Sequence, residues 1–208
     1  MPAGGAEPSS FLIAAKAAPD AVLAYHGALE YHAIAYSLGN VRTILTTTKA
    51  KSFRHAGITY RAARFPRALD SAEKRLFAVE SREERGATLR VTSLERTLVD
   101  LLDRPEFGGG WEEVWRSFDG AGFVDPKVVV RHALNLASRT TAARVGWFLE
   151  EHREQWMIPE SSFDQLSAMV PRSPVYLNRS HREHGVLHHR WNLIVPQRIH
   201  ARGWAEVL

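Results

Sequence analysis

The sequence predicts an α+β fold in which a mixed sheet and a helical bundle subdomain form a single compact unit. Extended, β-branched segments fill residues 41–92, helical periodicity dominates residues 93–170, and extended segments return over residues 174–196. A chain of 208 residues that is 45% hydrophobic can bury a core without covalent cross-links. We therefore expect a sheet-rich part, a helical part and closing strands around one core.

The N-terminal stretch, residues 1–18, is rich in alanine and glycine and is expected to be a flexible tail. The folded domain is then expected to cover residues 19–208. Pro19 and Asp20 are predicted to open its first helix, which would run to about Ile34 with Asp20 as the N-cap.

The predicted sheet comes from β-branched runs that turn residues separate. Residues 41–48 read VRTILTTT, which is typical of a strand, and residues 58–65 form the next candidate. Residues 76–80 and 88–92 flank a charged loop with Gly86 near its turn, so we expect a hairpin there.

The most informative stretch is Val91–Glu113, which predicts a capped helix, a break and a second helix. Thr92 is a candidate N-cap, and Glu95 would complete a capping box. Four leucines then recur at helical spacing: Leu94, Leu98, Leu101 and Leu102. Pro105 and the glycines at 108–110 end this helix and leave a joint before the next one.

The helical part continues to about residue 169. Four further helices are predicted over about residues 111–121, from Asp125 and Pro126 onward, from Thr140 or Thr141 onward, and over about residues 160–169. Extended segments at residues 174–177 and 190–195 close the domain, the second of them with a buried tryptophan.

Composition narrows the classes of function. The chain has no cysteine, which excludes disulfides, thiolate zinc sites and cysteine nucleophiles. The absence of cysteine suits a reducing compartment. Because neither a secretion signal nor a membrane span is evident, we expect a cytoplasmic protein without a membrane partner. The formal net charge of +4 gives weak support to an acidic or nucleic-acid partner.

Several motifs in this order resemble the C-terminal domain of AbiEi-family antitoxins. The first is VTSLERTLVDLLDRPEFGGGWEEVW, and it is followed by RVGWFLEEH at Arg144–His152. AYHGALEYHAIA at Ala24–Ala35 resembles the helix that opens the same domain, and LHHRWNLIVP at Leu187–Pro196 resembles its closing strand. The resemblance spans about residue 20 to the C-terminus.

The resemblance implies an antitoxin that is paired with a nucleotidyltransferase toxin. In the mycobacterial branch such toxins add nucleotides to the 3′ end of tRNA. Typical members carry an N-terminal winged helix that binds the operator, but too few residues precede Ala24 to form one here, so we do not expect DNA binding. Some mycobacterial members resemble atypical serine kinases that phosphorylate the toxin, which would require ATP and Mg²⁺.

One helix face carries the candidate catalytic residues Arg96, Asp100 and Asp103. Carboxylates three residues apart can point at one Mg²⁺, and an arginine can reach a γ-phosphate. The alternative is structural, because Arg96 and Asp100, and also Asp100 and Arg104, have the i,i+4 spacing of ion pairs. On the residues alone we favour the ion pairs.

A second candidate surface is basic and lies at the predicted sheet edge. Its residues would meet phosphate or an acidic partner: Lys49, Lys51, Arg54, Arg61 and Arg64. Arg67 extends the same edge. The alternative is a solvated edge, since lysines near strand ends also discourage edge pairing.

Other motifs predict no site. The glycine run at 108–110 lacks the Lys-Ser/Thr of a phosphate-binding loop and is expected to be a hinge. The histidines have no standard zinc spacing, so no metal site is predicted: His181, His184, His188 and His189. The helical tryptophans are expected in the core or at a partner interface: Trp111, Trp115, Trp147 and Trp156.

Three functions are therefore compared. The chain is expected to neutralise a toxin either as an atypical kinase or as an inhibitor that only binds. A DNA-binding autorepressor is the third possibility.

Overall fold

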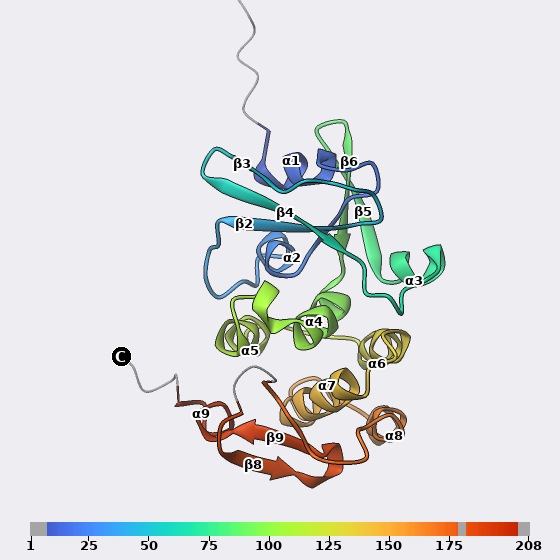
Figure 1. Cartoon of the computed structure of the whole chain (residues 1–208), viewed down its shortest axis with the longest axis vertical. Coiled ribbons are helices and arrows are strands. Elements are labelled where there is room, and N and C mark those ends of the chain that lie inside the picture. The colour runs from blue at the N-terminus through green and yellow to red at the C-terminus, as the bar shows by residue number, and fades with distance from the viewer. Residues whose placement is uncertain (1–7, 179–181, 204–208) are drawn as a thin grey trace, which may run out of the picture.

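A computed structural model describes residues 8–178 and 182–203 (Figure 1). A six-stranded mixed sheet forms one end of the molecule, helices form the middle, and a three-stranded sheet forms the other end. Buried side chains connect these parts in an α+β fold, as the sequence predicts. Within the described residues, no helix is both long and apolar enough to cross a bilayer.

The large sheet has the strand order β3-β4-β2-β1-β6-β5. Its strands are β1 (Val22–Ala24), β2 (Val41–Thr46), β3 (Phe53–His55), β4 (Ile58–Arg64), β5 (Val79–Glu84) and β6 (Ala87–Thr92). β2 runs parallel to β4 with Thr46 opposite Arg64, and β1 runs parallel to β6. The remaining pairs are antiparallel, including the predicted β5–β6 hairpin.

The prediction of one helix from Pro19 to Ile34 is wrong. Val22–Ala24 form β1 in the middle of the sheet, and only α2 (His26–Tyr31) is helical. All three β1 residues are buried, because this short apolar run is covered on both faces. Asp20 caps no helix and instead accepts hydrogen bonds from the hydroxyls of Thr46 and Thr47.

The expected flexible tail is wrong where the structure describes it, from residue 8 to residue 18. Residues Ser10–Lys16 form helix α1, and Ser9 caps it by accepting a hydrogen bond from the backbone N–H of Leu12 at 3.3 Å. Leu12 and Ala14 are buried, and Ala14 belongs to a cluster on the outer face of the sheet. Burial against the sheet therefore orders an alanine-rich segment that has little periodic signal of its own.

The helices in the middle of the molecule are α4 (Leu94–Asp103), α5 (Trp111–Asp119), α6 (Pro126–Asn135), α7 (Arg139–Glu151) and α8 (Glu160–Ser167), with the 3₁₀ turn η1 (Pro105–Phe107) between α4 and α5. Two short helices were not predicted: α3 (Ala72–Leu76) precedes β5 of the large sheet, and α9 (Gln197–His200) packs against β8 and β9 of the small sheet. Asp125 caps α6 as predicted, by accepting from the N–H of Lys127 at 2.9 Å.

The predicted N-cap of α4 is wrong by one residue. Ser93, not Thr92, caps the helix and accepts from the N–H of Arg96 at 3.4 Å. The Thr92 hydroxyl lies 2.7 Å from that of Thr97 inside the core. α7 likewise begins earlier than predicted, because Ser138 caps it and accepts from the N–H of Thr141 at 3.2 Å.

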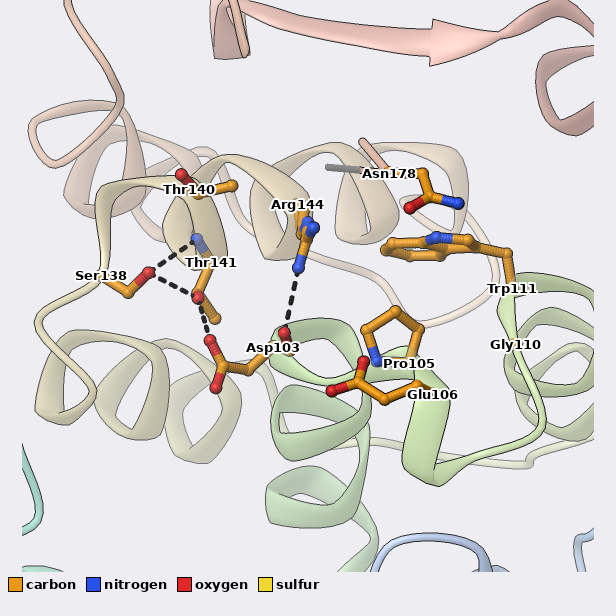
Figure 2. A pocket seen from close by; sticks show the side chains of 10 residues that line it. All are labelled: Asp103, Pro105, Glu106, Gly110, Trp111, Ser138, Thr140, Thr141, Arg144 and Asn178. Carbon is orange, nitrogen blue, oxygen red and sulfur yellow. Dashed lines mark hydrogen bonds between the residues drawn. The ribbon is translucent and has the colours of Figure 1, made fainter. Parts of the chain in front are cut away.

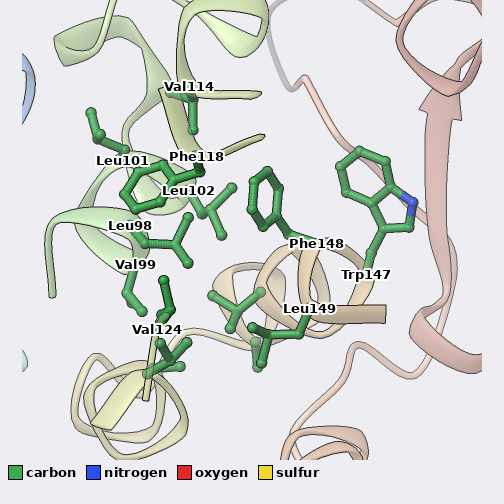
Figure 3. Packing of buried hydrophobic residues seen from close by; sticks show 14 of the residues in the cluster. Leu98, Val99, Leu101, Leu102, Val114, Phe118, Val124, Trp147, Phe148 and Leu149 are labelled. Atoms are coloured by element: carbon green, nitrogen blue, oxygen red, sulfur yellow. The ribbon is translucent and has the colours of Figure 1, made fainter. Parts of the chain in front are cut away.

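One hydrophobic core joins the large sheet to the bundle. Val22 and Leu45 from the sheet belong to the same buried cluster as the apolar faces of α4 to α8. Figure 3 shows Leu98 and Leu102 of α4 together with Phe118 and Phe148 from neighbouring helices in this cluster. Of the leucine stripe predicted for α4, Leu98, Leu101 and Leu102 are therefore buried in this core, whereas Leu94 is half-buried.

The second sheet closes the far side of α7. Its strands are β7 (Val175–Tyr176), β8 (Gly185–His188) and β9 (Leu193–Pro196), in the order β7-β9-β8. The predicted buried tryptophan, Trp191, is fully buried but lies in the 3₁₀ turn η2 (His189–Trp191). It packs so closely on α7 that a Cβ added to Gly146 would lie 2.2 Å from its ring.

Candidate functional site

A cavity lies where α4 ends and both α5 and α7 begin (Figure 2). Its volume is about 660 Å³. Its lining combines two carboxylates, hydroxyls, an arginine and an indole: Asp103, Pro105, Glu106, Gly110, Trp111, Ser138, Thr140, Thr141, Arg144 and Asn178. We refer to it as the α4–α7 pocket.

Local sequence explains how the helices meet here. Pro105 follows the last turn of α4 and begins η1. Gly110 has φ of +102°, a conformation that favours glycine, and it turns the chain directly into α5. The first residue of α5, Trp111, then forms one wall of the pocket. The predicted glycine hinge is thus a fixed turn between two packed helices.

Arg144 of α7 forms the floor and is only 6% exposed. One terminal nitrogen donates to the carbonyl oxygens of Leu102 and Asp103, each at 3.0 Å, and the other donates to that of Leu177 at 2.6 Å. Its guanidinium lies 5.5 Å from the centroid of the Trp111 ring. The cation therefore sits at the negative end of the α4 dipole, which stabilises a buried charge.

The acidic side of the pocket comes from Asp103 and Glu106. The Thr141 hydroxyl donates to Asp103 at 2.5 Å and lies 2.7 Å from the Ser138 oxygen, as Figure 2 shows. Arg104 approaches the other Asp103 oxygen at 3.5 Å. Glu106 is exposed and forms no ion pair or hydrogen bond within the described chain.

The structure separates the three candidate catalytic residues. Arg96 and Asp100 are 0% and 2% exposed and form an i,i+4 ion pair at 3.3 Å. Arg96 also donates to the carbonyl oxygens of Arg75 and Phe77, at 2.6 and 2.7 Å. Of the three, only Asp103 lines the pocket. The Arg104 side chain forms its ion pair with Asp103 and not, as the i,i+4 spacing suggested, with Asp100.

Asp100 has a second partner that sequence reasoning missed. Nε2 of His132 on α6 lies 2.9 Å from the carboxylate, and His132 is fully buried. Burial alone would raise the pKa of Asp100, but the nearby His132 and Arg96 outweigh it and lower the pKa. No sequence signal links these residues, which are 32 positions apart. The cluster faces the core and has the geometry of a structural ion pair.

The candidate basic residues do not form one surface. Lys49, Lys51 and Arg54 are exposed around β3, and within the described chain none of them has an ion-pair partner. Arg61 faces the bundle, where its guanidinium lies 5.3 Å from the ring centroid of Phe107. Arg64 is three residues farther along β4, so it points to the opposite face. It donates a hydrogen bond to the carbonyl oxygen of Thr47.

A smaller cavity of about 290 Å³ lies beside the α4–α7 pocket, and Glu106 lines both. Arg61 and Phe107 line this second cavity too. Its wall contains the partly buried His26, whose ring nitrogens lie 3.0 Å from Glu30 and 3.2 Å from Glu113. The i,i+4 spacing of His26 and Glu30 was visible in the sequence, whereas the contact with Glu113 of α5 was not.

Metal-ligating groups give no further site. No cluster of at least three histidine, aspartate or glutamate side chains in the described residues could hold a metal ion. His181 lies outside the described residues. The rings of His188 and His200 are 5.3 Å apart. The four tryptophans predicted to lie on helices are buried, which agrees with the core interpretation, although Trp156 lies in the turn after α7: Trp111, Trp115, Trp147 and Trp156.

Comparison with known proteins identifies a shared fold. The sequence matches no protein-family model, and no curated protein matches it. One solved structure, that of the Rv2827c protein from Mycobacterium tuberculosis, superposes with a TM-score of 0.56 at 14% sequence identity. The match covers 89% of this chain and 66% of that chain, so this protein spans slightly less than two thirds of its structural neighbour. At this identity the likeness concerns the fold alone.

Proposed function

We propose that this protein is an antitoxin that neutralises a cognate nucleotidyltransferase toxin by binding to it. The observation that carries the proposal is the packing of the AbiEi-like segments against one another. Arg144 of RVGWFLEEH donates to the carbonyl oxygens of Leu102 and Asp103 in VTSLERTLVDLLDR. Trp191 of LHHRWNLIVP donates to Glu150 of α7 at 2.6 Å. Segments that are distant in the sequence therefore form one unit, which is expected if together they define a domain.

The basic edge supports a binding role. Between Lys49 and Leu69 the sequence contains six lysine and arginine residues and no carboxylate. None of these cations forms an ion pair in the described chain, whereas buried Arg42 pairs with Glu30 at 2.7 Å. Unpaired cations on one side of a protein attract an acidic partner and accelerate its association. We therefore assign the toxin contact to Lys49, Lys51 and Arg54, which are all exposed around β3.

Co-expression with the toxin tests this assignment. The double variant Lys49→Glu, Arg54→Glu reverses two exposed charges, so we expect it to lose growth rescue and to bind the purified toxin at least about tenfold more weakly. Lys127→Glu is the matched control, since Lys127 is also exposed and has no ion pair in the described chain. Rescue and binding by the double variant at parental levels would contradict the proposal. Arg96 and Asp100 are unsuitable for this test because they are buried.

A second candidate mechanism is phosphorylation of a toxin serine, and the lining of the α4–α7 pocket favours it. Asp103 and Glu106 are the residues that would hold Mg²⁺, and Arg144 is the arginine in the same lining that could contact phosphate oxygens. ATP with Mg²⁺ would supply the phosphoryl group. The serine oxygen would bond to the γ-phosphorus, the bond to the β-phosphate oxygen would break, and ADP would leave. The serine proton would pass to a carboxylate or to solvent.

Mass spectrometry of the toxin separates the two mechanisms. After incubation with this protein, ATP and Mg²⁺, a kinase would add one phosphate to the toxin, and Asp103→Asn would abolish the gain. Glu112→Gln is the control, because Glu112 is exposed on α5 and does not line the pocket. An unmodified toxin that is nevertheless inhibited would exclude phosphorylation and leave binding as the mechanism.

A further inference from the structure

The carboxyl ends of the parallel strands β2 and β4 border a small cationic cavity. Thr46 ends β2 and Arg64 ends β4, and the two residues are paired in the parallel register. The chain leaves β4 here on its way to α3, as Figure 1 shows. The cavity measures about 240 Å³ and is lined by Thr46, Thr47, Arg64, Phe65, Pro66, Arg67, Leu69, Asp70 and Arg75. We call it the arginine pocket.

Neutral groups hold two of its three guanidinium groups in place. Arg64 donates to the carbonyl oxygen of Thr47. Arg75 donates to the carbonyl oxygens of Leu69 and Asp70, at 3.3 and 2.8 Å. Because these acceptors carry no formal charge, they orient the arginines without neutralising them. Arg67 is exposed and has no hydrogen bond or ion pair in the described chain.

The nearby carboxylates are already engaged. Asp70 pairs with Lys74 at 3.0 Å, and the hydrogen bond and charge of Lys74 lower the pKa of Asp70. Asp20 accepts hydrogen bonds from the hydroxyls of Thr46 and Thr47 and from the N–H of Thr47. With Lys74 included, cations outnumber carboxylates around the pocket. An anion entering it would therefore meet a net positive field.

We propose that the arginine pocket binds a phosphate group. Guanidinium forks on separate segments can contact different oxygens of one tetrahedral anion, and such charge-assisted hydrogen bonds are the strong ones. The location agrees with the general tendency of ligands to bind at the carboxyl ends of parallel strands. The volume suits one phosphate rather than a whole nucleotide, so the rest of the ligand would lie outside. This inference is independent of the antitoxin proposal, because Arg67 and Arg75 are not among the residues assigned to the toxin contact.

Titration with inorganic phosphate, followed by amide NMR at constant ionic strength, tests the site. We expect saturable shifts confined to the amides of residues 46–48 and 64–75. Arg67→Gln should weaken phosphate binding about fivefold or more, because it removes a charge-assisted contact. Arg172→Gln is the matched control, since Arg172 is exposed, lies outside the pocket and has no ion pair in the described chain. It should bind phosphate like the parent protein.

Three results would overturn the proposal: shifts that do not saturate, equal binding by the Arg67→Gln variant, or glutarate binding as tightly as phosphate.

Two further probes then identify the source of the phosphate. If an oligouridylate of eight nucleotides binds at least tenfold more tightly than AMP, and the Arg67→Gln substitution weakens that binding, the ligand is an RNA backbone. If AMP binds as tightly as the oligonucleotide, the ligand is a free nucleotide. If the Arg67→Gln variant binds both probes as tightly as the parent protein does, the proposed site is also contradicted.

Discussion

At the scale of single residues, the Asp100 cluster shows how a helix face that suggests chemistry can serve stability. Asp100 contacts Arg96 at 3.3 Å and His132 at 2.9 Å, and Asp100 and Arg96 are almost fully buried. Removing one partner of a buried ion pair strongly destabilises the folded protein, because the other charge stays buried without a counter-charge. The cluster joins α4 to α6 and, through the carbonyl oxygens of Arg75 and Phe77, to the C-terminal end of α3.

We predict that Asp100→Asn lowers the free energy of unfolding by about 3 kcal/mol at neutral pH, because Arg96 loses its buried counter-charge. Urea denaturation measures this change. Asp164→Asn is a suitable control, since the Asp164 side chain is 71% exposed. An Asp100→Asn variant as stable as the parent would show that the buried pair contributes nothing.

The same cluster predicts a pH dependence. The pKa of Asp100 is lowered in the folded protein, against the effect of burial, by His132 and Arg96. The unfolded chain therefore takes up the proton first, below about pH 4. The contribution of Asp100 is complete above that pH and is lost as the pH falls through the lower, folded-state pKa. Between pH 5 and pH 2 the parent should lose more stability than Asp100→Asn, and parallel curves for the two proteins would exclude this linkage.

Residue-level prediction from sequence succeeded where contacts are local. The i,i+4 spacing of Arg96 and Asp100 identified their ion pair, and the Asp125–Pro126 pattern identified the cap of α6. It failed where partners are distant, as with His132, whose contact with Asp100 depends on how α6 packs against α4. Arg144 was missed as the floor of the pocket for the same reason, since its acceptors lie on α4 and beside β7.

At the scale of elements, amphipathic helices were predictable and short buried segments were not. α4 and α5 have clear apolar faces, and both lie close to their predicted ranges. β1 is only three residues long, so its apolar run carries no period by which a strand could be told from a helix. α1 gains its order from contact with the sheet, which the sequence around Ser10 does not reveal.

Strand periodicity also explains why the basic edge divides. Arg61 and Arg64 are an odd number of positions apart, so a strand must place them on opposite faces. This was visible in the sequence once a strand over residues 58–65 had been proposed. What the sequence could not provide was the parallel pairing of β2 with β4, which places Arg64 beside Thr47. The arginine pocket depends on that pairing and on the position of α3, which places Arg75 beside the ends of β2 and β4.

At the scale of the whole molecule, the shared core predicts cooperative unfolding. Leu45 of β2 is fully buried and belongs to the cluster that contains the bundle helices. The described tryptophans all lie outside the large sheet, on or near α5, α7 and η2: Trp111, Trp115, Trp147, Trp156 and Trp191. Their fluorescence therefore reports on the bundle, whereas far-ultraviolet circular dichroism reports on all elements.

We predict that Leu45→Ala lowers the free energy of unfolding by about 3 kcal/mol through lost packing in the sheet. Because the core is continuous, the tryptophan fluorescence transition should shift to lower urea together with the circular dichroism transition. Thr88→Ala on exposed β6 surface is a control that should leave both midpoints close to parental. A dichroism shift without a fluorescence shift would mean that sheet and bundle unfold separately.

The positions of the first and last described helices have a practical consequence. α1 and α9 lie at opposite ends of the long axis (Figure 1). A biotin attached beyond α9 would anchor the molecule to a biosensor chip by its three-stranded end, with the basic edge and the arginine pocket directed toward the flowing solution. One immobilised sample could then receive toxin and oligonucleotide in sequence, and the two signals would show whether these ligands compete.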